Sequence, residues 1–142
     1  MLQALPYPIR QQCPPGACSC GRDELLDALA AAPETDARIL RLTREEEKRL
    51  IARIEAIASY EELEHMTLRM EQLLGMAVRI TPSVRGVRTV RGLAIELAER
   101  RGLCRKTRQA IPAAIRRCLD RHPDIVYALL NARDLLGAAS SS

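Results

Sequence analysis

The sequence predicts an all-α fold, a small bundle of four to six helices that leaves room for a short β-hairpin near residues 77–88. The core must be aliphatic, because the 142 residues include no Phe, no Trp and only three Tyr. Sandwiches and barrels favour aromatic and β-branched residues, whereas helices pack well through Leu, Ala and Met. Apolar residues also recur at three- and four-residue spacing over much of the chain. Both observations favour helices packed on helices.

The chain length suits one ordinary domain. Residues 1–21 are rich in Cys and Pro, so we expect an irregular N-terminal segment there. Residues 22–137 are predicted to form a single helical domain, and residues 138–142 a frayed tail.

The first half of the chain predicts three helices, at about 22–32, 43–57 and 59–74. Pro33 ends the first of them and Gly75 ends the last. The second and third begin with a capping box, in which Thr or Ser and a Glu three residues later satisfy free backbone N–H groups (Thr43 with Glu46, Ser59 with Glu62). The short link between these two helices predicts an antiparallel hairpin or a sharp bend.

The second half predicts an extended excursion over 77–88 and then three more helices. The first covers about 89–101, because Val90, Leu93, Ala94, Leu97 and Ala98 have helical spacing. The next lies within 103–122. It carries one apolar face, which comprises Ile111, Ile115, Cys118 and Leu119. The last begins at Pro123, a residue that suits a first helical turn, and ends at Gly137.

The net charge of +4 conceals a division of the chain. Residues 1–75 contain 9 Lys and Arg against 13 Asp and Glu, whereas residues 76–121 contain 12 against 3. Twenty of the 22 basic residues are Arg, a bias that a GC-rich genome can produce. Such a bias does not explain why acids are scarce in the same stretch. A basic stretch of this density is typical of a surface that binds phosphates.

Residues 97–107 (LAERRGLCRKT) resemble the first helix and turn of a helix-turn-helix, with Ala98 at the small position and Gly102 in the turn. The resemblance implies that the following helix enters the DNA major groove. The sequence departs from the pattern at Arg108, in a slot that is normally apolar, and at Pro112, inside the implied recognition helix. The candidate nucleic-acid-binding residues are Arg100, Arg101, Arg105, Lys106, Arg108, Arg116 and Arg117.

Three cysteines are crowded into the segment Cys13-Pro-Pro-Gly-Ala-Cys18-Ser-Cys20. The spacing resembles the start of a plant-type [2Fe–2S] loop, C-x4-C-x2-C, except that the second gap is one residue. Zinc sites more often use C-x2-C pairs. Cys104 is the favoured fourth ligand, because backbone N–H groups at a helix start stabilise a thiolate. Cys118 already belongs to an apolar face.

We therefore expect zinc or an iron–sulfur cluster at Cys13, Cys18, Cys20 and Cys104. A thiol redox sensor and a segment whose cysteines do nothing specific remain open alternatives. The cysteines are not accompanied by a secretory signal pattern, and no run approaches the roughly 18 apolar residues of a membrane span. Both observations favour a cytoplasmic location.

The acids show no spacing typical of a paired-carboxylate or two-metal site. Cys118 and His122 are four residues apart, but no third group is nominated to orient the base of such a pair, so the protein is expected not to be an enzyme. The expected function is that of an accessory or regulatory protein that binds DNA or RNA through its basic helical face. The alternatives are a protein–protein adaptor with acidic and basic faces and a small iron–sulfur protein.

Overall fold

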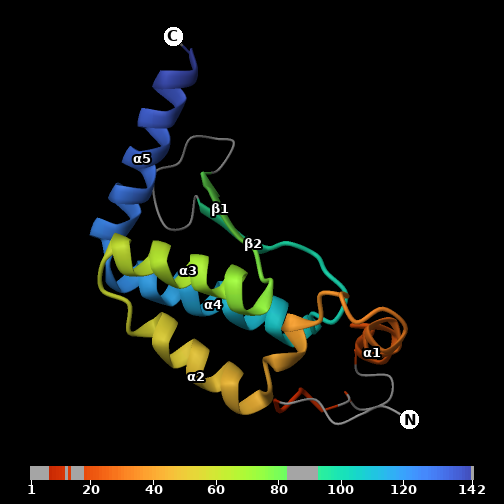
Figure 1. Cartoon of the computed structure of the whole chain (residues 1–142). Coiled ribbons are helices and arrows are strands. Elements are labelled where there is room, and N and C mark those ends of the chain that lie inside the picture. The colour runs from red at the N-terminus through yellow and green to blue at the C-terminus, as the bar shows by residue number, and fades with distance from the viewer. Residues whose placement is uncertain (1–6, 12, 14–17, 83–92, 142) are drawn as a thin grey trace.

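The computed structural model describes residues 7–11, 13, 18–82 and 93–141. These residues are mostly α-helical and include a two-stranded antiparallel sheet (Figure 1). This architecture agrees with the predicted small helical bundle with a hairpin. Among the helices described, none has both the length and the apolar composition that crossing a membrane would require.

Helix α1 (Arg22–Ala31) forms where the sequence predicts it and stops before Pro33. A short 3-10 helix, η1 (Arg38–Arg41), follows and was not predicted. Four residues are too few to show a hydrophobic period. Its Ile39 and Leu40 are nevertheless fully buried, so η1 belongs to the core.

Helices α2 (Arg44–Glu55) and α3 (Tyr60–Leu74) confirm the predicted pair. The Thr43 hydroxyl accepts a hydrogen bond from the backbone N–H of Glu46, and Ser59 does the same for Glu62. The Glu62 carboxylate reaches back to the N–H of Ala58, one residue earlier than a strict capping box requires.

The region after α3 corrects one prediction. Strand β1 (Val78–Pro82) pairs antiparallel with β2 (Leu93–Leu97), with Ile80 opposite Ile95. The helix predicted over 89–101 is therefore wrong from residue 93 onward, and the extended structure resumes beyond the predicted hairpin limit of 88. Residues 83–92 lie outside the described part of the chain.

The apolar residues of β2 fit two periods, which explains the error. Leu93 and Leu97 suit a helical face, but Leu93, Ile95 and Leu97 also alternate with more exposed neighbours. Pairing with β1 satisfies the backbone N–H and C=O groups of this segment, so it forms a strand rather than a helix.

Helix α4 (Arg105–Arg121) confirms the predicted apolar face, since Ile111, Ile115, Cys118 and Leu119 are fully buried. Pro112 lies inside α4 without ending it. The likeness to a helix-turn-helix does not survive, because the segment expected to be its first helix is β2 followed by a loop.

Helix α5 (Pro123–Ser141) begins at Pro123 as predicted and continues four residues past Gly137, the expected end. Its Ile125 and Val126 are buried.

The central element is α4, which packs against α2, β2 and α5. Helix α3 packs against η1 and α5. In Figure 1, α1 and the N-terminal segment lie at the end of the molecule opposite to the tip of α5. The N–H of Gly102, just before α4, donates to the carbonyl of Cys20, so the start of α4 lies close to the N-terminal cysteines.

Candidate metal centre

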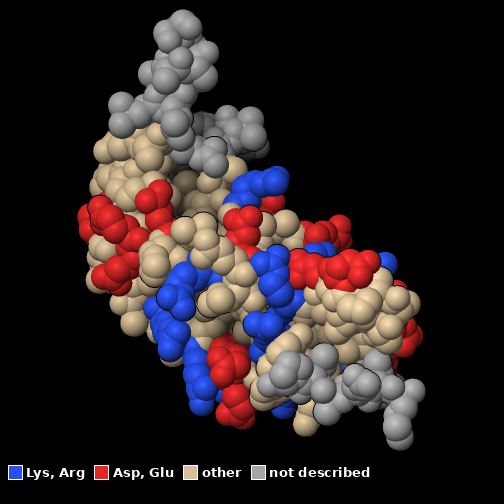
Figure 2. Space-filling view, viewed as in Figure 1, with Lys and Arg blue, Asp and Glu red and all other residues tan. Residues whose placement is uncertain are grey.

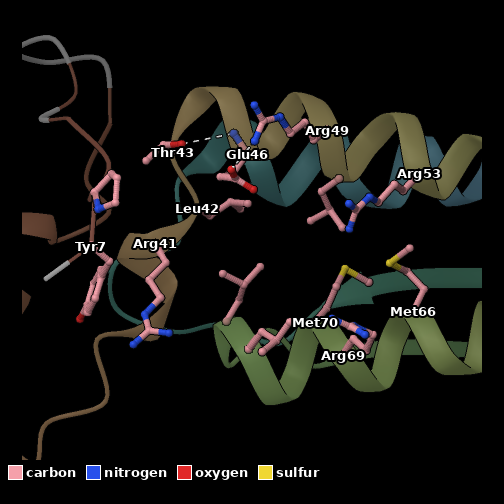
Figure 3. Close-up of a pocket in the computed structure, with 14 residues that line it drawn as sticks. Tyr7, Arg41, Leu42, Thr43, Glu46, Arg49, Arg53, Met66, Arg69 and Met70 are labelled. Carbon is pink, nitrogen blue, oxygen red and sulfur yellow. Dashed lines mark hydrogen bonds and ion pairs between the residues drawn. The ribbon is translucent and has the colours of Figure 1, made fainter.

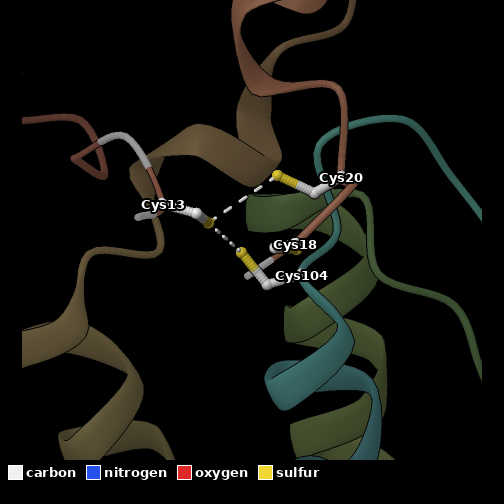
Figure 4. Close-up of side chains that lie close together, drawn as sticks. All are labelled: Cys13, Cys18, Cys20 and Cys104. Atoms are coloured by element: carbon white, nitrogen blue, oxygen red, sulfur yellow. Dashed lines mark hydrogen bonds between the residues drawn. The ribbon is translucent and has the colours of Figure 1, made fainter. Parts of the chain in front are cut away.

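The structure brings together the four cysteines that the sequence nominates. The Sγ atoms of Cys13, Cys18, Cys20 and Cys104 all lie within 4.8 Å of one another. Cys104 is 84 residues from Cys20 in sequence and lies directly before α4, as its N-cap. Figure 4 shows Cys13 approaching from one loop, with Cys20 and Cys104 on the other side. The fourth candidate ligand is thus supplied by the fold, across a long sequence separation.

The distances suit a small ion. The Cys13 Sγ lies 3.5 Å from the Cys104 Sγ and 4.0 Å from the Cys20 Sγ. Four sulfurs bound tetrahedrally at about 2.3 Å from one zinc ion lie about 3.8 Å apart. The cysteines are free thiols rather than disulfides. They could hold a metal ion with little movement.

Backbone hydrogen bonds hold the cysteine segment against the rest of the fold. The N–H of Gly102 donates to the carbonyl of Cys20 at 2.6 Å. Gly102 has a φ of +92°, and a Cβ built there would come within 3.0 Å of the side chains of Ile39 and Leu25. Only glycine fits this close approach without strain. Gly102, taken from the sequence as a turn residue, therefore sets the position of Cys104 relative to Cys20.

The surroundings of the thiols differ. The backbone N–H of Arg105, at the start of α4, is the main cause that lowers the pKa of Cys18 to about 7. Burial raises the pKa of Cys13 and, more strongly, that of Cys104. The helix start thus favours a thiolate as predicted, but it acts on Cys18 rather than on Cys104.

Sequence reasoning missed Arg10, a cation beside the thiols. Its Nη2 donates to the Cys20 Sγ at 3.4 Å. Its Nε is buried and has no hydrogen-bond partner within the described ranges. The backbone N–H of Arg10 donates to the Leu40 carbonyl, and the Arg10 carbonyl accepts a hydrogen bond from the Arg22 side chain. A positive charge fixed here favours thiolates over thiols. The only signal in the sequence is its place three residues before Cys13.

The seven predicted nucleic-acid-binding residues divide into two groups. The first makes internal contacts: Arg100 donates to the Gly75 carbonyl, Arg116 to the Leu93 carbonyl, and Arg108 and Arg117 pair with Glu99 and Glu55. The second comprises Arg101, Arg105 and Lys106, which are exposed and whose side chains make no hydrogen bond or ion pair in the described part of the chain. These three lie within five residues of Cys104, beside the cysteine cluster.

Cys118 takes no part in the cluster. It is fully buried on α4, and its Sγ lies 3.4 Å from the Ile57 carbonyl.

Comparison of the chain with protein-family models, curated proteins and solved structures finds no match.

Proposed function

We propose that the protein is a non-enzymatic metal-binding protein that holds one zinc ion through Cys13, Cys18, Cys20 and Cys104. The observation that carries this proposal is the mutual approach of four sulfurs within 4.8 Å. No other cluster of three or more Cys, His, Asp or Glu ligands with comparable geometry occurs in the described residues.

The geometry favours a single ion over an iron–sulfur cluster. In a [2Fe–2S] cluster each pair of thiolates binds a different iron, so sulfurs across the cluster lie farther apart than two ligands of one ion. A set in which every pair is within 4.8 Å fits one tetrahedral centre.

Four protein thiolates would complete the coordination of zinc and leave no position for water or substrate. Closed sites of this kind are structural. Here the ion would join the N-terminal segment, which supplies three ligands, to the start of α4, which supplies the fourth. The Arg10 guanidinium and the N–H of Arg105 would offset part of the negative charge of the centre.

The test is metal analysis of protein purified without oxygen or chelator. We expect about one zinc per chain, a colourless preparation, and the visible absorption of a tetrahedral thiolate site when Co²⁺ replaces zinc. Cys18→Ser and Cys104→Ser should each lose the ion. Cys118→Ala is the matched control, because it removes a cysteine outside the cluster and should keep the full metal content.

Three results would contradict the zinc proposal. Brown protein with iron and inorganic sulfide would indicate a cluster. Metal-free protein that forms a Cys13–Cys104 disulfide under mild oxidation would favour the redox sensor. Metal-free protein whose cluster thiols all react freely with a thiol reagent would leave the cysteines without a specific role.

A second candidate function is nucleic-acid binding beside this centre. It is favoured by Arg101, Arg105 and Lys106, which are exposed and grouped around the Cys104 end of α4. Metal binding at Cys104 would fix the turn that carries Arg101 and the start of α4, which carries Arg105 and Lys106.

The second function is tested with duplex DNA and RNA in a salt titration. Each phosphate contact releases counterions, so affinity should fall steeply with salt, and Arg105→Ala with Lys106→Ala should flatten the slope. Arg117→Ala, a cation already paired with Glu55, serves as the control. Absence of binding at about 50 mM salt would remove this candidate.

A further inference from the structure

A groove of about 400 Å³ runs between α2 and α3 and shares no residue with the cysteine cluster (Figure 3). Its volume is within the range of about 300–1,000 Å³ typical of ligand sites. The two helices diverge here because α2 packs chiefly on α4, whereas α3 packs on η1 and α5. The apolar floor is formed by Leu42, Leu50, Met66, Met70, Leu73 and Leu74.

The rim of this groove is cationic although this half of the chain is acidic overall. Its arginines are Arg41, Arg49, Arg53 and Arg69, all of them exposed. The lining contains one acid, Glu46, which pairs with Arg49 at 2.8 Å. Figure 2 shows Lys and Arg side chains over α2 and α3 on this face, with acidic side chains beside those of α2. The positive charge of the rim is therefore largely uncompensated.

The arginines stand on both walls. Arg49 and Arg53 are four residues apart on α2, and Arg69 is on α3. The side chains of Arg53 and Arg69 make no hydrogen bond or ion pair with any residue that the structure describes. Arg41 lies at one end, 4.1 Å above the centroid of the Tyr7 ring.

The floor also exposes apolar surface. Leu73 is 50% exposed although it faces a concave region, and Met66 is half-buried. Methionine side chains adapt to different partners and are common at helix-binding surfaces. An apolar strip with cations on both walls is complementary to an apolar strip flanked by anions on both sides.

We propose that this groove docks an acidic amphipathic helix of a partner protein. Apolar side chains on one face of that helix would enter the floor, and Asp or Glu on its flanks would meet the arginines of each wall. A fatty-acid anion carries a single charge, which leaves most of the arginines unmatched. A nucleic acid would match the cations but not the apolar floor.

The probe is a synthetic peptide of roughly 18 residues with blocked ends, long enough to form a helix. Leu recurs in it at three- and four-residue spacing, and Glu fills both flanks. One control peptide has the same composition in scrambled order, and another has Gln in place of Glu. Binding to the full chain is followed by fluorescence anisotropy at low and high salt. The wild-type chain should bind the first peptide, bind each control peptide more weakly, and bind less at high salt.

The groove offers two matched pairs of variants. The double change Arg49→Glu with Arg53→Glu should weaken binding about tenfold or more, whereas Arg44→Glu with Lys48→Glu reverses the same charge on α2 outside the groove and should not. Leu73→Ser should weaken binding, and Leu68→Ser should not. Leu68 is a fair control because it is on α3, 52% exposed, and outside the groove lining.

Circular dichroism of each variant verifies that it is folded, which these exposed positions should allow. Equal loss in the test and control variants would overturn the proposal, as would equal affinity for the Gln peptide or no binding at all. Tighter binding of an oligonucleotide of matched charge, with the same dependence on Arg49 and Arg53, would reassign the groove to nucleic acid.

Discussion

The basic second half and the acidic first half of the chain both contain arginines that contact the protein itself and arginines that stand exposed. In residues 76–121, Arg100, Arg116 and Arg117 bind carbonyl or carboxylate groups of the protein itself. In the first half, Arg53 and Arg69 stand exposed on the walls of the α2–α3 groove. Net charge along the sequence therefore does not locate the cations that are available to a partner.

The physical reason is that arginine serves two purposes. Its guanidinium carries five N–H donors in a planar fork, so it can tie carbonyl groups of separate elements together. Arg100 does so by donating to the carbonyls of Gly75 and Asp36, at the end of α3 and before η1. A surface arginine without such acceptors remains available to bind an anionic group of a partner.

The largest effect should come from Arg100→Ala. This change removes two charge-assisted hydrogen bonds and the ion pair with Asp36, so the free energy of unfolding should fall by about 2 kcal/mol. Urea unfolding measures it. The neighbouring Arg101→Ala is the control and should change stability by no more than about 0.5 kcal/mol. Equal losses would show that the two cations are not distinguished by their internal contacts.

A smaller effect is expected at the pair of Arg117 and Glu55, which joins α4 to α2. Arg117 donates to one Glu55 oxygen through Nε at 3.0 Å and Nη2 at 2.7 Å. The pair is partly exposed, so its coupling energy in a double-mutant cycle should be below about 1 kcal/mol and should shrink with added salt. A salt-independent coupling would contradict this reading of the pair as a surface contact.

Acid should lower the free energy of unfolding by a modest amount through Asp36, whose carboxylate pairs with Arg38 and Arg100. The hydrogen bonds from Arg38, with the charge of Arg100, hold the pKa of the Asp36 carboxyl well below its usual range. The ionised carboxylate therefore stabilises the native state above the ordinary carboxyl pKa, and this contribution is lost as the pH falls below about 4. Stability measured from neutral to acidic pH should decline less steeply in Asp36→Asn than in the wild type. The carboxylate is 44% exposed, which limits the effect. An unchanged slope would show that Asp36 has no share in acid sensitivity.

The smallest effect is expected in the groove. Arg53→Ala and Arg69→Ala remove cations that make no hydrogen bond or ion pair in the described residues, so each should change the free energy of unfolding by less than about 0.5 kcal/mol. Thermal and urea unfolding both report this quantity. A loss above about 1 kcal/mol at either site would mean that the groove arginines are structural too, and the contrast between bound and exposed arginines would fail.

Local signals in the sequence were enough for most helices. Capping residues and breakers act within a few residues, so Thr43, Ser59, Gly75 and Pro123 mark helix ends correctly. The apolar face of α4 also follows from its own spacing. The prediction of a helix over residues 93–97 was wrong because their apolar residues satisfy two periods, and only pairing with β1 decides between them.

The candidate metal centre was likewise predicted from the sequence only in part. Three crowded cysteines on a Pro-rich segment indicate a ligand set by themselves, and the helix start after Gly102 pointed to Cys104. Their approach within 4.8 Å depends on long-range contacts, above all the hydrogen bond from Gly102 to Cys20. Arg10 and the groove could not be predicted, because no local pattern states which distant groups a side chain will meet.

The sequence by itself determined the helical class, most helix boundaries and the identity of the four thiols. Only the tertiary structure decided the second strand of the hairpin, the convergence of the thiols, and which arginines are bound internally and which are exposed. Propensity, capping and periodicity act over a few residues, whereas strand pairing, close packing at a glycine and the choice of acceptors for a guanidinium depend on segments far apart in the chain.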